Sequence, residues 1–375
     1  MDLWVIDKNT RVIVSMVRTY TFVQYSKELS NSGSFEIRIP VNDESIPYII
    51  RENYIYFDKG VVGIIKEIKD TQDSDVEITV TGYLSNHILT YRSFLLTTKY
   101  YNNVVTTSRN MVTNLFINPT DTRRKINYIV LTTDSKYIPT ITSGSVTYQN
   151  TGDNLLTVLN ELYLEEDLAF ELYPNIQTVE NQPNLINFEF RTIKPVDRTV
   201  TNTDGNDPVV FSFDLDNLSY FQYDEDGMDY CSMALVASED SGENRVTLEV
   251  GDTTKTGIDR IELYVDARDI QSETVEGTTL TQQELEDLMR QRGLKKLEEH
   301  EVFTDVDASI IAENKMYVYE EDYFLGDYVT VQSKKLNKMV NLQITKVTKS
   351  ISNGVEHFDL GFGKDKLSFV KIDLL

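Results

Sequence analysis

Carboxylates are the most numerous residues of this sequence that could do chemistry. The chain has 60 Asp and Glu residues among 375, with clusters in EED at 165–167 and DEDGMD at 224–229. A glycosidase needs two carboxyl groups that face a cleft at a defined separation. In so acidic a chain such pairs arise by chance, and no sequence feature distinguishes one pair from another. We therefore predict no catalytic residue and expect a protein that is not an enzyme.

The second acidic run could instead bind calcium. Asp224, Asp226 and Asp229 surround Gly227, and clustered oxygen ligands on a tight turn suit a hard cation. In a calcium-binding loop of the EF-hand type the glycine stands at position six, whereas here it stands fourth, and Leu235 occupies the place of the bidentate Glu. The pattern favours a solvated acidic turn over a calcium-stabilised adhesin, which remains an alternative.

Nucleophiles and metal-binding side chains are scarce. His87, His300 and His357 show no HxxH or HExxH spacing, and the single cysteine, Cys231, lies in an apolar run where we expect a buried strand position. The sequence has no glycine-rich phosphate loop and no GxSxG motif. It therefore predicts no metal site and no cofactor, and one cysteine cannot form an intramolecular disulfide.

The 22 tyrosines could stack on sugars or fill a protein interface. Tyr54 and Tyr56 are two residues apart, as are Tyr317 and Tyr319, so each pair shares one face of a strand. Packing within the sheet is the favoured interpretation. A carbohydrate-binding module or glycosidase on a β-sandwich, of a phage or bacterial surface, remains the alternative function.

The elements that position these residues begin with a segment of period two, from 1 to about 95. The run NSGSFEIRIPV at 31–41 predicts a half-buried strand. Its buried side is expected to consist of Phe35, Ile37, Ile39 and Val41. Similar runs occupy 19–26, 53–57, 61–68 and 76–83. A helical turn is expected at 44–50, and the isolated Gly63 predicts a bulge or a bend. We predict a sheet or barrel.

The pattern changes between about 96 and 207. Apolar residues recur at steps of three and four over 104–116 and again over 155–163, which predicts two helices. A strand is expected at 185–193. This middle part is predicted to be a small α+β domain.

Strand periodicity returns from about 208 to the end. Strands are expected at 209–215, 230–238, 244–250, 260–267, 315–320, 323–332, 340–347 and 357–362. One helix interrupts them at 281–300, where Thr281 and Glu284 match a capping box. Its apolar face comprises Leu285, Leu288, Met289 and Leu297. We expect this helix to lie across the flank of a barrel.

Charge and composition exclude several classes of protein. The formal net charge of −24 repels phosphate backbones and anionic lipids, so nucleic-acid reading is not expected. The N-terminal sequence lacks the apolar stretch of a signal peptide, and no run of about 18 apolar residues occurs. We expect no membrane-spanning segment, folding in a reducing cytoplasm, and oligomerisation through paired strand edges.

Two charged segments are the best candidates for contacts with partners. The stretch GIDRIELYVDARDI at 257–270 combines a glycine turn with a strand whose opposite charges could pair across neighbouring strands or subunits. The second candidate is the LGD turn within 323–332. The predicted interface residues are Arg260, Glu262, Asp266, Arg268, Asp269, Leu325, Gly326 and Asp327.

These two segments, taken with RGLKKLEE at 292–299, GSFEIRIP at 33–40 and LSNHILTYR at 84–92, resemble the baseplate and tail-tip hub proteins of long-tailed bacteriophages. The order of the segments matches along nearly the whole chain. The resemblance implies a mainly β fold with α+β insertions: two tail-tube-like β-barrels per chain plus smaller accessory domains. It places the first barrel at 1–95, the α+β accessory domain at 96–207, and the second barrel with its flanking helix 281–300 at 208–375.

The same resemblance implies a function. Three chains would form a ring of six barrels around a central channel, join the sixfold tail tube to the threefold tip, and let viral DNA pass without adhering to the acidic wall. The implied location is the distal end of the tail in the virion. The implied partners are the distal tail or tube protein, the tape-measure protein and the receptor-binding or tip proteins. Because the chain stops at Leu375, we expect any lytic or host-recognising role to lie in another protein.

Overall fold

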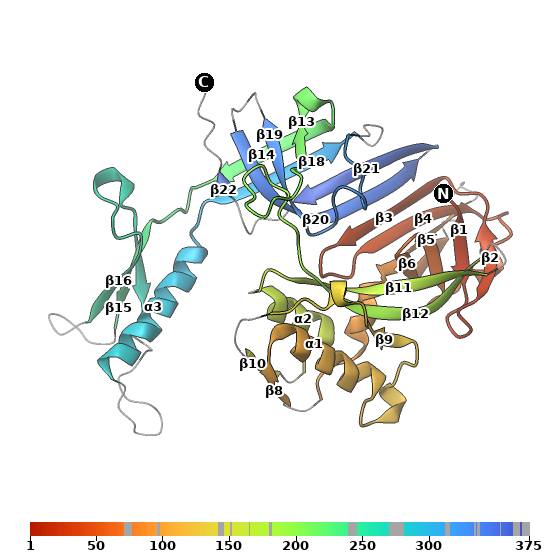
Figure 1. The fold of residues 1–375 in the computed structure, drawn as a ribbon, viewed down its shortest axis with the longest axis horizontal. Coiled ribbons are helices and arrows are strands. Elements are labelled where there is room, and N and C mark those ends of the chain that lie inside the picture. The colour runs from red at the N-terminus through yellow and green to blue at the C-terminus, as the bar shows by residue number, and fades with distance from the viewer. Residues whose placement is uncertain are drawn as a thin grey trace. The chain divides into compact units, whose positions relative to one another are not determined.

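The computed structural model describes residues 1–70, 77–95, 98–141, 146–150, 152–164, 166–179, 182–238, 246–268, 270, 281–311, 316–333, 335, 338–352, 354–362 and 368–369. The chain divides into two compact units (Figure 1). The larger unit combines Met1–Gln222 with Val306–Leu375, and the smaller unit is Tyr223–Asp305. The fold is mainly β, as the sequence predicts.

The first strands of the larger unit include the five expected from the period of two, together with β1 and β2, which were not predicted. They are β1 (Leu3–Ile6), β2 (Ile13–Val17), β3 (Phe22–Glu28), β4 (Ser34–Pro40), β5 (Tyr54–Asp58), β6 (Val61–Asp70) and β7 (Glu77–Leu84). In β4, Phe35, Ile37 and Ile39 are buried whereas Arg38 is exposed, because successive side chains of a strand point to opposite faces. The helical turn predicted at 44–50 is present as η1 (Ile46–Tyr48). Val41 was wrongly assigned to the buried face: it follows the end of β4 and is 41 % exposed.

Of the two alternatives predicted for Gly63, a bulge or a bend, the bulge was wrong. The register shifts lie between Tyr56 and Asp58 in β5 and between Ile65 and Glu67 in β6. Gly63 instead makes room for an aromatic ring, since a Cβ there would lie 2.5 Å from Phe35. A glycine inside a strand can mark a close approach of another group as well as a bulge or a bend.

The last strands of the larger unit continue the same sheet. They are β13 (Val210–Ser212), β14 (Leu218–Asp226), β18 (Phe303–Ile310), β19 (Tyr328–Ser333), β20 (Lys338–Ser352), β21 (Val355–Phe362) and β22 (Ser368–Phe369). The strand order is β14-β18-β21-β20-β3-β4-β7-β6-β5-β1-β2, with β13, β19 and β22 attached beside this path.

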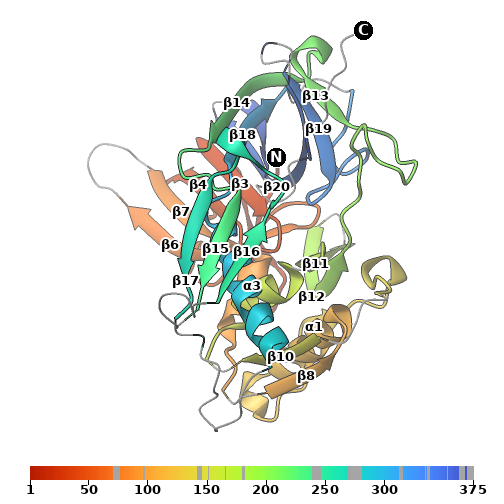
Figure 2. The same ribbon diagram turned by 90° about the vertical axis from the view of Figure 1, so that its left-hand side faces the viewer.

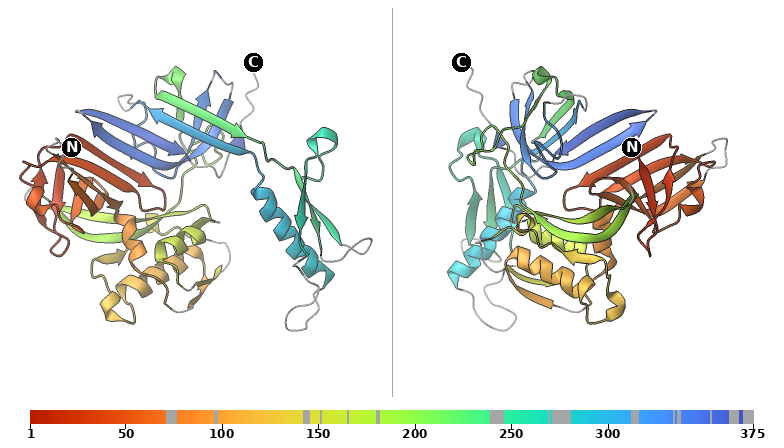
Figure 3. Two further views of the ribbon diagram at one scale, coloured as in Figure 1. Left: turned by 180° about the vertical axis from the view of Figure 1, so that it is seen from behind. Right: turned by 45° about the vertical axis from the view of Figure 1, so that its right-hand side comes forward.

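The long strand β20 joins the two strand sets. It pairs antiparallel with β19 over Lys338–Gln343, and with β3 over Lys346–Ser352. Figures 1 and 3 show this arrangement, with blue β20 beside red β3. The chain therefore pairs residues near its beginning with residues near its end.

The middle part contains both predicted helices. They are α1 (Val104–Val112), continued by the π-helical turn η3 (Thr113–Ile117), and α2 (Leu155–Leu164). The accompanying strands are β8 (Thr98–Asn102), β9 (Ile129–Leu131), β10 (Val146–Asn150), β11 (Ala169–Val179) and β12 (Gln182–Ile193). The helices and β11–β12 share a hydrophobic core with Ile6, Tyr54, Val62 and Ile64, so this segment packs directly on the first strand set.

The smaller unit is a three-stranded sheet with one helix. Its strands are β15 (Met233–Ala237), β16 (Thr247–Gly251) and β17 (Glu262–Asp266), in the order β16-β15-β17 (Figure 2). The predicted helix is α3 (Gln282–Glu298). Met289 and Leu297 of α3 pack on Ala234, Val236 and Val250, so the helix covers one face of this sheet. Leu288, assigned to its apolar face, is 42 % exposed.

Three further expectations from the C-terminal pattern were wrong. Met316–Glu320 forms turns and a single bridge rather than a strand. The strand expected over 323–332 begins only at Tyr328, because Gly326 has a φ of 103° that no regular strand adopts. Cys231 is partly exposed and precedes β15.

Candidate functional site

The predicted interface residues lie in different compact units. Arg260, Glu262, Asp266 and Arg268 belong to the smaller unit, whereas the LGD turn belongs to the larger one. Asp269 lies outside the described residues. The two candidate segments are therefore treated as two separate surfaces.

The charged residues of the smaller unit gather on the sheet face opposite α3. Because side chains alternate along a strand, Val250 and Val265 face the helix whereas Glu249, Glu262 and Asp266 point to the other side. Within the described part of the chain β17 pairs only with β15, so it is an edge strand. We call this surface, made of Glu249, Arg260, Glu262, Tyr264, Asp266 and Arg268, the open face.

Arg260 spans the open face. Its Nη2 donates to Glu249 Oε1 at 2.8 Å, and its Nε donates to Glu262 Oε1 at 2.6 Å. Glu249 lies on β16 and Glu262 on β17, so the guanidinium crosses over β15, the strand between them. The two carboxylates raise the pKa of Arg260 through hydrogen bonds and charge. Its pairing is thus across strands of one chain.

Arg268 and Tyr264 are more accessible. Arg268 Nε lies 2.9 Å from both carboxylate oxygens of Asp266, and its side chain is 63 % exposed. Tyr264 is 58 % exposed. An exposed aromatic ring beside an arginine is typical of the residues enriched in protein interfaces.

The LGD turn has a structural role that the sequence pattern did not indicate. Gly326 and Asp327 are buried. The Asp327 carboxylate accepts hydrogen bonds from Arg198 Nε at 2.9 Å and from the backbone N–H groups of Val196 and Phe324 at 3.1 and 3.0 Å. Burial raises the pKa of Asp327, and these donors oppose that effect. The turn therefore fixes the start of β19 against the segment that follows β12.

A cavity of about 510 Å³ in the larger unit was not anticipated. Its walls come from seven parts of the chain: the end of β3 with the β3–β4 connection, the β5–β6 turn, residues 84–86 at the end of β7, residues 136–137, β11, the end of β12 with the segment that follows, and the segment around the LGD turn. Leu325 and Asp327 line it. Residues so far apart in sequence carry no shared motif, so no local pattern could have revealed this cavity.

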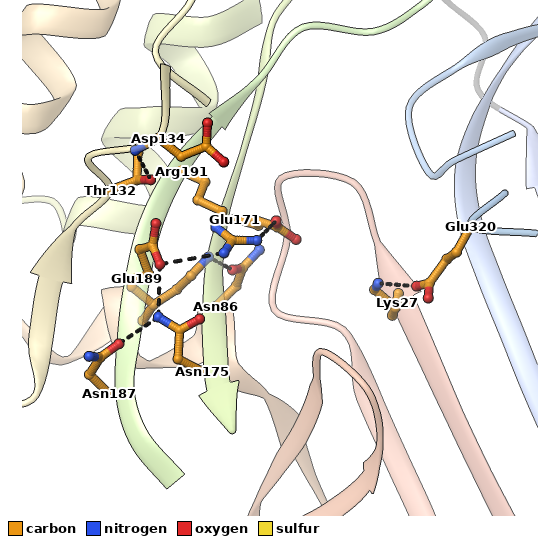
Figure 4. A network of polar contacts seen from close by, with 11 residues as sticks. Lys27, Asn86, Thr132, Asp134, Glu171, Asn175, Asn187, Glu189, Arg191 and Glu320 are labelled. Atoms are coloured by element: carbon orange, nitrogen blue, oxygen red, sulfur yellow. Dashed lines mark hydrogen bonds and ion pairs between the residues drawn. The ribbon is translucent and has the colours of Figure 1, made fainter. Parts of the chain in front are cut away.

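Arg191 of β12 is the central charged residue of the cavity wall (Figure 4). Its guanidinium carbon lies 4.4 Å from the ring centre of Tyr137 and 3.7 Å from that of Tyr173. It also lies near two carboxylates, with Nη1 3.7 Å from Glu171 and Nη2 3.4 Å from Glu189. Burial raises the pKa of Glu171, whereas Lys27 and Arg191 act in the opposite direction.

A second ion pair connects the strand sets across the same cavity. Lys27 of β3 lies 3.5 Å from Glu320, which precedes β19 (Figure 4). Burial would lower the pKa of Lys27, but Tyr319, Glu171 and Glu320 outweigh it, so the pKa is raised. The charged groups of the cavity thus come from both ends of the chain.

The other sequence candidates take ordinary places. In the described residues no group of three or more His, Cys, Asp or Glu is placed to hold a metal ion, and Asp226 accepts the backbone N–H of Met228. The Tyr54 hydroxyl lies 3.3 Å from that of Tyr128, and Tyr319 packs on Tyr323. These tyrosines therefore make packing contacts.

No helix in the described ranges combines the length and the apolar character needed to cross a membrane. The longest described helix, α3, carries exposed charged residues along its length.

The chain matches one protein family over nearly its whole length. A family model described as Siphovirus ReqiPepy6 Gp37-like protein matches residues 2–364. No curated protein sequence matches the chain. Among solved structures, the fold is similar to the 43 kDa tail protein of prophage MuSo2 from Shewanella oneidensis, with a TM-score of 0.56 and 12 % identity over 97 % of this chain and 98 % of that one.

Two further tail proteins have similar folds over similar lengths. One is from Neisseria meningitidis MC58, with a TM-score of 0.55 and 12 % identity over 97 % of this chain and 96 % of that one. The other is prophage tail protein gp18 from Listeria monocytogenes EGD-e, with a TM-score of 0.50 and 15 % identity over 98 % and 96 % of the two chains.

Proposed function

Because the chain belongs to the Siphovirus ReqiPepy6 Gp37-like family of phage tail proteins, we propose that it is the non-catalytic hub at the distal end of a phage tail. The observation that carries the proposal is the family match over residues 2–364. The resemblance recognised in the sequence is confirmed at the level of the family. The hub role is a more specific claim than membership of the family.

The proposed hub has two tail-tube-like barrels per chain and assembles as a homotrimer. The set β1–β7 would supply one barrel and the set β13, β14 and β18–β22 would supply the other. Their junction through β3 and β20 supports a fixed register between them. The accessory parts would then be the α+β segment and the smaller unit. We retain the division into 1–95, 96–207 and 208–375 as part of this proposal, with the smaller unit as an accessory part within the last segment.

The net charge of −24 supports a channel through which DNA passes. Like charges repel, so DNA moving past an acidic wall is not adsorbed to it. In this proposal the ring joins the sixfold tube to the threefold tip. It contacts the distal tail or tube protein, the tape-measure protein and the receptor-binding or tip proteins.

The open face is the proposed surface for contacts between subunits or with tail partners. It combines an exposed aromatic residue, paired charges and an edge strand, and unpaired strand edges are templates for pairing with another chain. Arg260, Glu262, Asp266 and Arg268 lie there, and we retain Asp269 as the neighbour of this group. The LGD turn, Leu325–Asp327, is proposed to act through the cavity that it lines.

The test is the molar mass of the purified chain by light scattering over a wide concentration range, followed by negative-stain imaging. We expect a trimer with a central hole at high concentration. A chain that stays monomeric throughout and does not incorporate into tails lacking their own copy would contradict the hub role. Specific binding to a cell-wall saccharide in a glycan screen would then favour the carbohydrate-binding alternative.

A further inference from the structure

Three lysines at the rim of the cavity form no ion pair with any acid that the structure describes. Lys59, Lys136 and Lys194 line the cavity and are exposed. Among the residues that the structure describes, no carboxylate lies within ion-pair distance of any of the three. The whole lining has six basic residues, Lys27, Lys59, Lys136, Arg191, Lys194 and Arg198, against four acidic ones, Glu28, Glu171, Glu320 and Asp327. In a chain with 60 acidic and 36 basic residues, this local excess of positive charge favours the binding of anions.

The wall behind this rim contains an arginine with spare donors. Arg191 is held between two tyrosine rings, and its side chain is only 13 % exposed. A guanidinium has five N–H donors, yet its two carboxylate neighbours lie at 3.7 and 3.4 Å. Strong charge-assisted bonds are about 2.7–2.9 Å long. The existing contacts therefore hold the guanidinium in place but leave N–H donors available for a further carboxylate.

The remaining lining has apolar groups beside the charges. Leu29, Val61, Ile193 and Phe324 contribute to it. A volume of about 510 Å³ lies within the range of roughly 300–1,000 Å³ that is usual for ligand sites. This volume is larger than a single carboxylate needs. The mixture of charged and apolar lining residues suits a ligand that carries carboxylates next to apolar side chains.

We propose that this cavity binds an acidic peptide segment of a partner protein, with its carboxylates on the rim lysines and Arg191 and its apolar side chains inside. A long polyanion such as DNA would meet the negative field of the whole molecule, whereas a short segment meets chiefly the local positive one. The recognition does not depend on a trimeric ring. The proposal therefore stands or falls separately from the hub role.

The experiment measures binding of a fluorescently labelled peptide of alternating Glu and Leu to the isolated chain, by anisotropy at about 10 mM and about 150 mM salt. We expect saturable binding that weakens at the higher salt. The triple variant Lys59→Glu, Lys136→Glu, Lys194→Glu should bind about tenfold more weakly or worse. Any binding of a peptide with Lys in place of Glu should not be weakened in this triple variant, because it would not use the rim lysines.

The matched control replaces three exposed lysines that do not line the cavity: Lys125→Glu, Lys255→Glu and Lys295→Glu. It changes the net charge equally, so it should retain most of the affinity. Equal losses in both triple variants would show a non-specific charge effect and overturn the proposal. Three other results would also overturn the proposal. They are displacement of the labelled peptide by glutarate as effectively as by unlabelled peptide, binding of single-stranded DNA more tightly than the peptide, and no peptide binding at either salt concentration.

Discussion

Asp43 is a buried carboxylate that organises the connection after β4. Its Oδ2 accepts hydrogen bonds from Thr19 N and Thr19 Oγ1, both at 2.8 Å, and from Arg18 N at 3.1 Å, while Oδ1 accepts one from Ser45 N at 2.9 Å. Burial by itself would raise the pKa of Asp43, but the donors at Ser45 and Thr19 lower it overall. The folded protein therefore holds this carboxyl in its charged form.

Replacing this residue should reveal its charge as a pH effect. A lowered folded pKa contributes stability above the unfolded value near 3.8, and this contribution is lost as the pH falls through the lower folded pKa. We expect Asp43→Asn to lower the free energy of unfolding by about 1–3 kcal/mol at pH 7. Urea unfolding from pH 7 to pH 3 should show the difference shrinking below about pH 4.

A suitable control is Asp204→Asn, since the Asp204 side chain is exposed. It should leave the free energy of unfolding nearly unchanged at every pH. A difference between wild type and Asp43→Asn that persists undiminished at pH 3 would contradict the role assigned to the charge.

At the scale of elements, close approach of strands depends on Gly82 of β7. A Cβ at this position would lie 1.9 Å from the carbonyl oxygen of Ile64 on β6 and 2.7 Å from the Phe35 ring on β4. The backbone carbonyl of Ile64 cannot move away to relieve such a contact, as a flexible side chain could. The glycine is therefore required by packing within the sheet.

Gly82→Ala should destabilise the larger unit. Overpacking of a core typically costs about 1–3 kcal/mol, and we expect at least that loss in urea unfolding. The control is Gly227→Ala, where a Cβ meets its nearest atom at 3.7 Å, and its stability should stay close to wild type. Equal stability of the two variants would show that β6 and β7 do not approach as described.

The pairing of β3 with β20 can be tested through one hydrogen bond. Ser26 Oγ and Thr348 Oγ1 lie 2.8 Å apart across these strands. A double-mutant cycle with Ser26→Ala and Thr348→Val should give a coupling free energy of about 0.5–1.5 kcal/mol. The comparison cycle pairs Ser26→Ala with Thr247→Val of the smaller unit and should be additive. Additivity in the first cycle would argue against this junction.

For the whole molecule, the sharpest prediction concerns assembly. Arg268 bonds to Asp266 at an exposed position, and exposed ion pairs contribute little to folding. Arg268→Glu should therefore change the melting temperature by no more than about 2 °C, yet reduce trimer formation measured by light scattering. Lys255→Glu, also exposed in the smaller unit, serves as the control. Normal assembly of Arg268→Glu would remove Arg268 from the proposed interface.

Local patterns predicted the elements that depend on local contacts. The seven residues expected to form the apolar face of the first helix are all buried in α1 and η3. The six residues expected to form the apolar face of the second helix are likewise all buried in α2. Helix periodicity is a property of neighbouring residues, so it is visible in the sequence. The first of these sets is Val104, Val105, Ser108, Met111, Val112, Leu115 and Phe116, and the second is Leu155, Leu156, Val158, Leu159, Leu162 and Tyr163.

The candidate site was only partly accessible to such reasoning. Arg260 and Glu262 were noticed because opposite charges two residues apart are apparent in the sequence, and the structure pairs them. The LGD turn was noticed as well, but the burial of Asp327 was not, because its partner Arg198 lies 129 residues earlier. The cavity escaped prediction for the same reason.

Composition, short-range periodicity and the order of segments are enough to predict the mainly β character, the positions of the helices, the acidic charge and the family resemblance. They do not predict that β20 pairs with β3, that the charged residues of β17 lie opposite α3, or that Lys27, Arg191 and Glu320 line one cavity. Such contacts join distant segments through the packing of the whole chain. No local pattern of residues encodes them.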